Sequence, residues 1–508
     1  MMEQVATEDA LAGRTTPLHM DAESFRRAGH RLVDELADLM DTLRDRPVAP
    51  GRTVEQIRAT LDFDAPLPDR GDDPEALLAE ATRLLVENST FNGHPRFFGY
   101  ITAGPAPIGV LADLLASGVN PNVGGWPLSP MASEIEVQTI RWISELVGFP
   151  TTGRGILTSG GNVANMLGFW AARAAKAGWP VRARGMEDEA SVPLRVYGSA
   201  QTHTWIQKAA DLAGIGSDAV RWIPTDAELR MDVGALRAAI ERDLADGARP
   251  FLVVGTGGSV STGAVDPLPA IRALCDEFDL WFHVDGAYGA FAAAASRAPE
   301  DLRALSTADS VALDPHKWLY TPLEAGCALV RDPEALLRAF SYRPDYYHMS
   351  ETLTNFFEHG IQNSRGFRAL KVWLALRQAG RAGYARMIDD DIELARRFHG
   401  IASAHDELEA FTHGLSITTY RFVPADLRSR VGEPEVEAYL SELNETVLER
   451  LEHEGRAFVS NAVLGERYLL RMCIVNFRTS QEDVEALADV SAETGRVVDA
   501  DLRPQGLR

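Results

Sequence analysis

Cysteine is scarce in this sequence: only Cys275, Cys327 and Cys473 occur in 508 residues, far from one another. An odd and scattered set offers no disulfide framework, and neither the cysteines nor the histidines have the spacing of a metal site. We therefore expect no bound metal. A chain without disulfides is typical of a reducing compartment, so we expect a cytoplasmic protein.

Basic residues are outnumbered by acidic ones, 50 lysines and arginines against 73 aspartates and glutamates, which gives a net charge of −23. Nucleic-acid phosphates are bound by clustered Lys and Arg, so this balance argues against a nucleic-acid partner. The other fractions, 45% hydrophobic and 24% charged, are those of an ordinary globular protein. The length suggests two or three domains.

Long hydrophobic runs are also missing. The first 14 residues include acidic side chains and no apolar stretch, so we expect no secretory signal. Residues 114–133 carry no charge, but Asn, Pro and Gly residues interrupt them between positions 120 and 127. Such a run cannot hold a membrane-spanning helix, and we expect a soluble protein with no membrane partner.

The first part of the chain has the pattern of a helical arm. Residues 21–44 place their apolar side chains on one helical stripe, and a connector rich in Pro, Asp and Arg follows to about residue 75. This part has little core of its own. We therefore predict that residues 1–95 form an arm that lies on another domain or another subunit.

The middle of the chain alternates short apolar strands with helices, most clearly from about 150 to 330. Strands rich in Val, Leu and Phe without alternation indicate a mostly parallel sheet with helices on both faces. We predict an α/β fold with a large domain over 96–390. Residues 391–508, with two further strand candidates among helices, form a smaller α+β domain.

Ligands of such sheets bind at the carboxyl ends of the strands, and polar residues gather there. The stretch "TSGGN" joins a strand to a helix, so Gly160, Gly161 and Asn162 can hold a phosphate at the helix N-terminus. An ordinary tight turn with an Asn cap is the alternative. His203 opens the next helix, and Thr256 follows the strand "LVV".

The stretch "HVDGAYGA" places Asp285 at the inner end of a buried strand, with the small Ala287 beside it. A buried carboxylate requires a cationic partner, and no Lys or Arg is adjacent, which favours a ligand cation. The stretch "SVALDPHKWLY" places Lys317 between His316 and a tryptophan. Partial desolvation there would favour the neutral, nucleophilic amine.

Pyridoxal 5'-phosphate (PLP) would use these groups together. Its phosphate suits the glycine turn and His316, and its pyridine nitrogen would be held protonated by Asp285. His203 could stack on the ring, and Lys317 would form a Schiff base with the aldehyde. Each feature is common singly, but their order on successive strands points to this cofactor.

The chain resembles the PLP-dependent amino-acid decarboxylases that include the aromatic-amino-acid, tyrosine and tryptophan decarboxylases. The matching segments run through nearly the whole sequence and include "HPRFFGYI", "GGWPLSPMASEIE", "TSGGNVAN", "HVDGAYG", "DPHKWLY" and "GFRALKVWLALR". The resemblance implies the fold of aspartate aminotransferase, known as fold type I. It also implies a homodimer whose N-terminal helices clasp the partner and whose active sites share residues.

The resemblance implies a role for each matching residue. Lys317 matches the Schiff-base lysine, Asp285 the partner of the pyridine nitrogen and His203 the stacking histidine. Ala287 matches the small residue beside the ring, and Thr256 lies near the ring hydroxyl or the substrate.

The phosphate-contact positions of the family match Gly161, Asn162 and His316. Asp314 departs from the animal aromatic decarboxylases, which have Asn at this position. The family also has a loop tyrosine that protonates the substrate after carbon dioxide leaves. In "RPDYYHMS" this residue is Tyr346, or Tyr347 if the register differs by one.

Substrate selection is predicted from segments that line the pocket in relatives. Tyr100, Trp126 and Phe98 suit an apolar or aromatic side chain, although core packing is the alternative. Ser364 stands where plant relatives have Ser with phenolic and Gly with indolic substrates. We predict an aromatic, preferably phenolic, L-amino acid, because we find no basic anchors for an acidic one.

The predicted reaction is decarboxylation to the amine, with Lys317, Asp285, His203 and Tyr346 as catalytic residues. Three alternatives stay open. The first is an aldehyde-forming relative in which oxygen reacts with the decarboxylated intermediate, and the second is an aminotransferase or carbon–sulfur lyase of the same fold. The third is a non-catalytic binding protein with a relict pocket.

Overall fold

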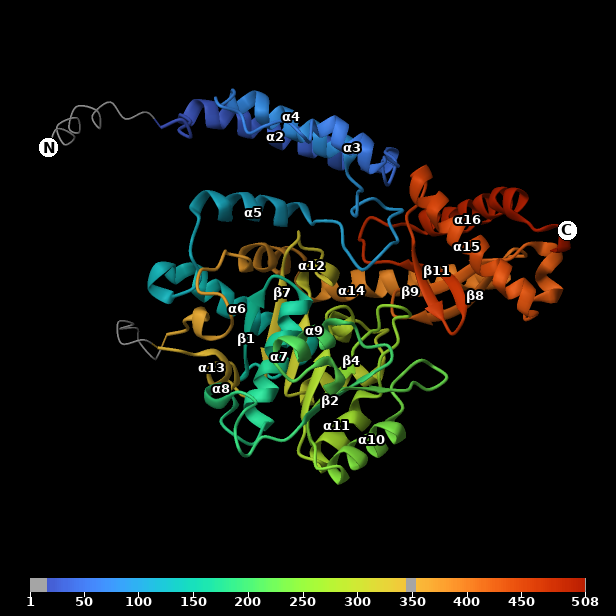
Figure 1. Ribbon diagram of the computed structural model, residues 1–508. Coiled ribbons are helices and arrows are strands. Elements are labelled where there is room, and N and C mark those ends of the chain that lie inside the picture. The colour runs from blue at the N-terminus through green and yellow to red at the C-terminus, as the bar shows by residue number, and fades with distance from the viewer. Residues whose placement is uncertain (1–15, 344–352, 508) are drawn as a thin grey trace. The chain divides into compact units, whose positions relative to one another are not determined.

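The computed structural model describes residues 16–343 and 353–507 (Figure 1). The chain folds into two compact units. One comprises the chain up to Phe91 together with Glu452–Arg456, and the other comprises Asn92–Leu451 and Ala457–Arg508. In the ranges described, no helix is both long and apolar enough for a membrane crossing.

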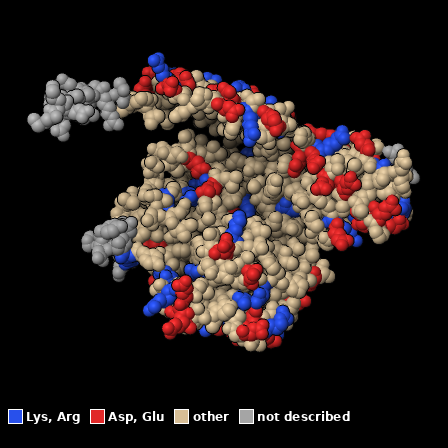
Figure 2. Space-filling model, viewed as in Figure 1, with Lys and Arg blue, Asp and Glu red and all other residues tan. Residues whose placement is uncertain are grey.

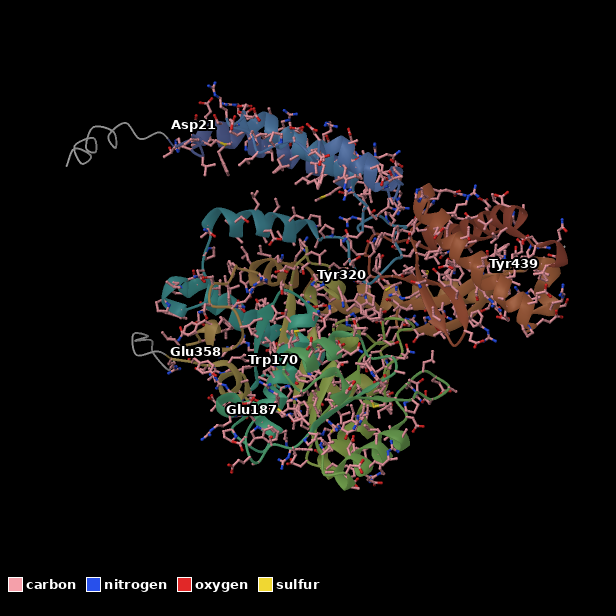
Figure 3. The ribbon with its side chains drawn as sticks, viewed as in Figure 1. Asp21, Trp170, Glu187, Tyr320, Glu358 and Tyr439 are labelled. Carbon is pink, nitrogen blue, oxygen red and sulfur yellow. The ribbon has the colours of Figure 1, made fainter. Side chains whose placement is uncertain are left out.

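The first unit contains the helices α2 (Ala22–Thr42), α3 (Val54–Leu61) and α4 (Pro74–Asn88). α2 confirms the helix predicted over 21–44, and the Asp21 side chain caps it by accepting two backbone N–H bonds (Figure 3). α2 packs on α4, where an ion pair of 2.9 Å joins Arg27 to Glu75. α3 lies in the segment that the sequence predicted to be a connector. A capping box formed by Thr53 and Gln56 starts this helix.

The second unit is built on a seven-stranded sheet in the order β1-β7-β6-β5-β4-β2-β3. Only β7 runs antiparallel to its neighbours, so the predicted mostly parallel sheet is confirmed. All residues of β5, β6 and β7 are buried, which requires helices on both faces. The strands are β1 (Arg154–Thr158), β2 (Leu194–Ser199), β3 (Val220–Ile223), β4 (Arg249–Thr256), β5 (Trp281–Asp285), β6 (Ser310–Leu313) and β7 (Gly326–Val330).

The helices of this sheet carry apolar stripes that pack on the strands. α7 lies against β1 and β4 to β7, and nine of its side chains or glycines are buried. The helices are α5 (Pro107–Val119), α6 (Pro130–Val147), α7 (Gly161–Lys176), α8 (Val181–Arg184), α9 (Trp205–Leu212), α10 (Val233–Ala245), α11 (Leu268–Glu277), α12 (Pro315–Trp318), α13 (Ala335–Phe340) and α14 (Ala369–Ala404). α14 is interrupted at Gly380, whose φ of 64° is not helical.

A second, four-stranded antiparallel sheet follows α14, in the order β10-β11-β9-β8. Its strands are β8 (Leu408–Gly414), β9 (Ile417–Phe422), β10 (Ser460–Leu464) and β11 (Arg467–Cys473), and its helices are α15 (Pro434–Glu454) and α16 (Gln481–Leu502). This part has its own hydrophobic core, which Phe98 also enters. The two-sheet architecture confirms the predicted fold type I class, whereas the exact boundaries 1–95, 96–390 and 391–508 stay predictions.

Charge is mixed on the visible surface. Figure 2 shows Lys and Arg side chains scattered among acidic ones, without a continuous basic tract on the described part of that face.

Candidate functional site

The carboxyl ends of the central strands bring the polar candidates together. Thr256 ends β4, Asp285 ends β5 in register with it, and Asp314 follows β6. The residues lining the cavity at this edge are Gly161, Asn162, Asn165, Gln201, His203, Thr256, Gly258, Val260, Asp285, Ala287, Tyr288, Asp314 and Lys317. Because β4, β5 and β6 run parallel, residues far apart in sequence meet here.

Lys317 lies on the one-turn helix α12, with its side chain 19% exposed. Its Nζ is 3.0 Å from Oδ2 of Asp314, the residue that precedes the turn. Oδ1 of Asp314 is buried and accepts no hydrogen bond within the described residues. The lysine is therefore held at the cavity by a carboxylate that keeps further hydrogen-bonding capacity.

The aromatic residues beside Lys317 anchor its turn. The Trp318 Nε1–H and the Tyr320 hydroxyl both donate to Oδ2 of Asp391 on α14, each over 2.8 Å (Figure 3 labels Tyr320). Trp318 also stacks on Tyr288, with ring centroids 4.9 Å apart. The apolar surroundings of the lysine are therefore a support that fixes its backbone.

Asp285 is 8% exposed and also lines the cavity. Its Oδ1 accepts the backbone N–H of Ala287 over 3.2 Å, and its Oδ2 accepts the Trp205 indole N–H over 2.7 Å. No Lys or Arg of the described chain pairs with it. The charge is thus solvated by neutral donors and is available to a cation inside the cavity.

A glycine cradle closes the end of the cavity where α7 begins. Gly160 has φ +146°, and a Cβ on Gly161 would lie 2.7 Å from Asp314 Oδ2 and 2.9 Å from Ala287 Cβ. No side chain fits there, and the first N–H groups of α7 remain accessible to an anion. His316, whose Nδ1 is 2.7 Å from the Ala325 carbonyl oxygen, stands beside Gly160.

His203 and Thr256 complete the predicted set. The His203 side chain is exposed, but the surrounding protein desolvates it enough to lower its pKa below the usual 6.5. Its Nδ1 accepts the backbone N–H of Trp205 over 3.2 Å. Thr256 is buried, and its Oγ1 lies 3.4 Å from the Thr202 hydroxyl. A neutral imidazole at the cavity mouth is suited to stacking on a flat ring.

The predicted substrate residues are not among those lining this cavity. Phe98 is completely buried in the core beside the second sheet. Tyr100 is 60% exposed, Ser364 is exposed, and half-buried Trp126 donates its Nε1–H to Glu134 over 2.8 Å. The proton donor candidates Tyr346 and Tyr347 fall outside the described residues.

Sequence reasoning missed several residues of the site. Asn165, Gln201, Gly258, Val260 and Tyr288 line the cavity. Tyr288 belongs to the quoted "HVDGAYG", so its position three residues after Asp285 was an available signal. Asn165 likewise ends the quoted "TSGGNVAN", one helical turn after Gly161. Gln201, Gly258 and Val260 gave no signal, because they lie on loops whose course is set by the whole sheet.

These residues fit PLP. An anion-binding helix N-terminus with a glycine cradle, a carboxylate free of cationic partners and a lysine amine open onto one cavity. PLP carries a phosphate, a basic ring nitrogen and an aldehyde, one group for each. Lys317, Asp285 and the cradle residues Gly160, Gly161 and Asn162 would hold it.

Comparisons with known proteins agree with this site. Residues 55–418 match the model of the pyridoxal-dependent decarboxylase conserved domain. The aromatic-L-amino-acid decarboxylase of Bacillus atrophaeus is 34% identical over 472 residues, 92% of this chain and 94% of the relative. A phenylacetaldehyde synthase of a Rosa hybrid cultivar is 29% identical over 91% of this chain and 92% of its own.

Solved structures are similar as well. The Oryza sativa TDC, crystallised with PLP and tryptamine, superimposes with a TM-score of 0.87 and 27% identity, covering 95% of this chain and 99% of that one. The family match covers the strands of the seven-stranded sheet, the glycine cradle, Asp285 and Lys317 together. The chain therefore belongs to the pyridoxal-dependent decarboxylase family, and it is a PLP-dependent decarboxylase of amino acids.

Proposed function

We propose that this enzyme converts an aromatic L-amino acid, preferably a phenolic one, to the corresponding amine and carbon dioxide. The observation that carries the proposal is the meeting of Lys317 and Asp285 at one cavity beside the Gly160–Gly161 cradle. Relatives named for aromatic amino acids, tyrosine and tryptophan support the substrate class.

Bound PLP supplies an electron sink for the bond between Cα and the departing carboxylate. Asp285 would keep the ring nitrogen protonated, because an adjacent anion raises the pKa of a cation. The Lys317 amine would hold the cofactor through its aldehyde. His203, whose pKa is lowered by desolvation, would stack on the ring, and the Tyr346 phenol would donate a proton to Cα of the substrate.

The substrate side of the site is proposed to be shared between two subunits. Tyr100 and Ser364 are exposed and Trp126 is half-buried, yet none of them lines the cavity of their own chain. In a homodimer they would serve the partner's cavity and supply the aromatic surface that the lining residues largely lack. Phe98 is too deeply buried to join them.

Three free, buried cysteines support a cytoplasmic location.

The second candidate function is oxidative: the decarboxylated substrate reacts with oxygen and leaves as an aldehyde. An aldehyde synthase of comparable similarity favours it. The stacking histidine and the loop tyrosine that amine formation needs are both present as His203 and Tyr346. We therefore favour amine formation.

A substrate screen tests the proposal. The holoenzyme is offered the twenty protein amino acids and common aromatic non-protein ones, while amine, carbon dioxide, aldehyde and oxygen uptake are measured. We expect tyrosine-like substrates to give equal amounts of amine and carbon dioxide without oxygen uptake. Aldehyde and hydrogen peroxide in place of amine would establish the second function instead.

The proton donor is tested by Tyr346→Phe. Without the phenol, protonation at Cα slows, so part of the product should leave as aldehyde with oxygen consumption while carbon dioxide release continues. Tyr347→Phe is the matched control and should leave the product unchanged. The reverse result would move the role to Tyr347, and an unchanged product from both variants would exclude the pair.

A further inference from the structure

Trp205 is a buried tryptophan that contacts two residues lining the cofactor site, Asp285 through its side chain and His203 through its backbone N–H. It is the first residue of α9, it is 1% exposed, and it is absent from the cavity lining. Its indole N–H points at Asp285 Oδ2 over 2.7 Å, a short bond for a nitrogen donor. The contact joins positions 80 residues apart.

The indole is fixed in place on its other sides. Phe169 on α7 meets it edge to face, with ring centroids 6.5 Å apart and planes at 88°. The His283 ring meets it at 77° and 5.7 Å, and that ring is itself held between Ser310 and Asn165 by hydrogen bonds of 2.7 Å. A donor locked in this way selects one orientation of the carboxylate it binds.

We propose that Trp205 is a positioning residue that locks the Asp285 carboxylate toward the cofactor's ring nitrogen. With Oδ2 held by the indole and Oδ1 by the Ala287 N–H, the carboxylate plane cannot rotate. Each oxygen retains a lone pair, so the face that opens onto the cavity keeps its capacity to accept.

The choice of an indole has an electrostatic consequence. A lysine or arginine at this place would form an ion pair and neutralise the charge that a cationic ring nitrogen needs. An indole N–H donates one hydrogen bond and carries no net charge, so it offsets the desolvation of Asp285 without cancelling its field. The inference depends on the family's cofactor and not on the proposed substrate.

The test is a double-mutant cycle of Trp205→Phe and Asp285→Asn, with PLP itself as the probe. PLP affinity is measured by absorbance titration of the cofactor-free protein, and the pH dependence of the visible absorbance is recorded. Removing one hydrogen bond to a charged group should weaken PLP binding roughly tenfold when Asp285 is present. In the Asp285→Asn background the same change should weaken it by no more than about twofold.

Trp170→Phe is the matched control. Trp170 lies on α7, packs edge to face on Phe340 with centroids 6.0 Å apart, and does not line the cavity (labelled in Figure 3). It should leave PLP affinity unchanged. Equal effects of Trp205→Phe in both backgrounds, or loss of folding in both, would show that the indole acts through packing alone and would overturn the proposal. Folding lost only with Asp285 present would support the coupling.

Discussion

At the residue scale, Gly161 shows how closely the cradle is built. It begins α7 after a backbone turn at Gly160, and an added Cβ would overlap both Asp314 and Ala287. Asp314 already pairs with Lys317, and Ala287 belongs to the turn that follows Asp285. A methyl group at Gly161 therefore disturbs the lysine, the aspartate turn and the anion-binding helix end together.

Gly161→Ala should weaken PLP binding by tenfold or more while the cofactor-free protein still folds, measured by absorbance titration and thermal unfolding. Gly400→Ala is the control, because Gly400 lies exposed in α14 with open space around its Cβ position. That change should leave PLP affinity alone and stabilise the protein by about 0.5–1 kcal/mol. Unchanged affinity in Gly161→Ala would show that the cradle does not hold the phosphate.

At the element scale, α12 and α14 meet through one buried carboxyl group. Burial raises the pKa of Asp391 to about 7, although the Trp318 and Tyr320 donors oppose the shift. The folded chain therefore binds a proton that the unfolded chain has released above its ordinary pKa of 3.8. This contribution to stability is complete below about pH 4 and is lost as pH rises to about 7.

Asp391→Asn should remove this dependence. Between about pH 4 and 7 the free energy of unfolding of the parent, relative to the variant, should fall with a slope of up to about 1.4 kcal/mol per pH unit. Urea unfolding of both proteins across that range measures the difference, and other titrating groups such as Asp266 cancel in it. Parallel stability curves would contradict a raised pKa at Asp391.

The strands that the sequence predicts are the buried ones. β1, β2, β4, β5, β6 and β7 are apolar runs, and their order is enough to predict that Asp285, Thr256 and Lys317 meet at one edge. β3 is not predicted, because this four-residue edge strand exposes Trp222 and contains Arg221. β8 and β10 are not predicted for the same reason, because part of each strand faces solvent.

Contacts between segments far apart in sequence could not be predicted either, for a different reason. The position of His203 at the start of its helix marks it as a candidate site residue. Trp205, two residues later, has the pattern of an ordinary core residue. Its bond to Asp285 exists only because the Trp205 side chain, at the start of α9, meets Asp285 and His283 of β5, and no local pattern encodes that approach. The resemblance to the family predicted Tyr100, Trp126 and Ser364 as substrate-binding residues, but they do not line the cavity of their own chain.

At the scale of the whole molecule, we predict that Tyr346 is among the residues that the proposed homodimer shares between its sites, so that two defective variants complement each other. Lys317→Ala lacks the cofactor-holding amine, and Tyr346→Phe lacks the proposed proton donor. If each site takes its tyrosine from the partner, a mixed dimer contains one site with both groups. Mixing the variants under conditions that exchange subunits should therefore restore amine formation, measured against each variant alone.

The mixing experiment would give a different result if Tyr346 did not act in the partner's site. If Tyr346 acts within its own chain, one site of the mixed dimer lacks the lysine and the other lacks the tyrosine. Amine output would then stay at the sum of the two separate variants, even though size-exclusion chromatography shows mixed dimers.

The central claim is that the Lys317 amine bonds to the PLP aldehyde while Asp285 faces the ring nitrogen. Borohydride reduction of the holoenzyme converts the lysine–cofactor bond to a stable secondary amine, and peptide mass spectrometry then locates it. The account predicts the cofactor mass on the peptide containing Lys317 and on none of those containing Lys176, Lys208 or Lys371, the remaining lysines of the chain. A label on another lysine, or no label on a protein that has bound PLP, would contradict it.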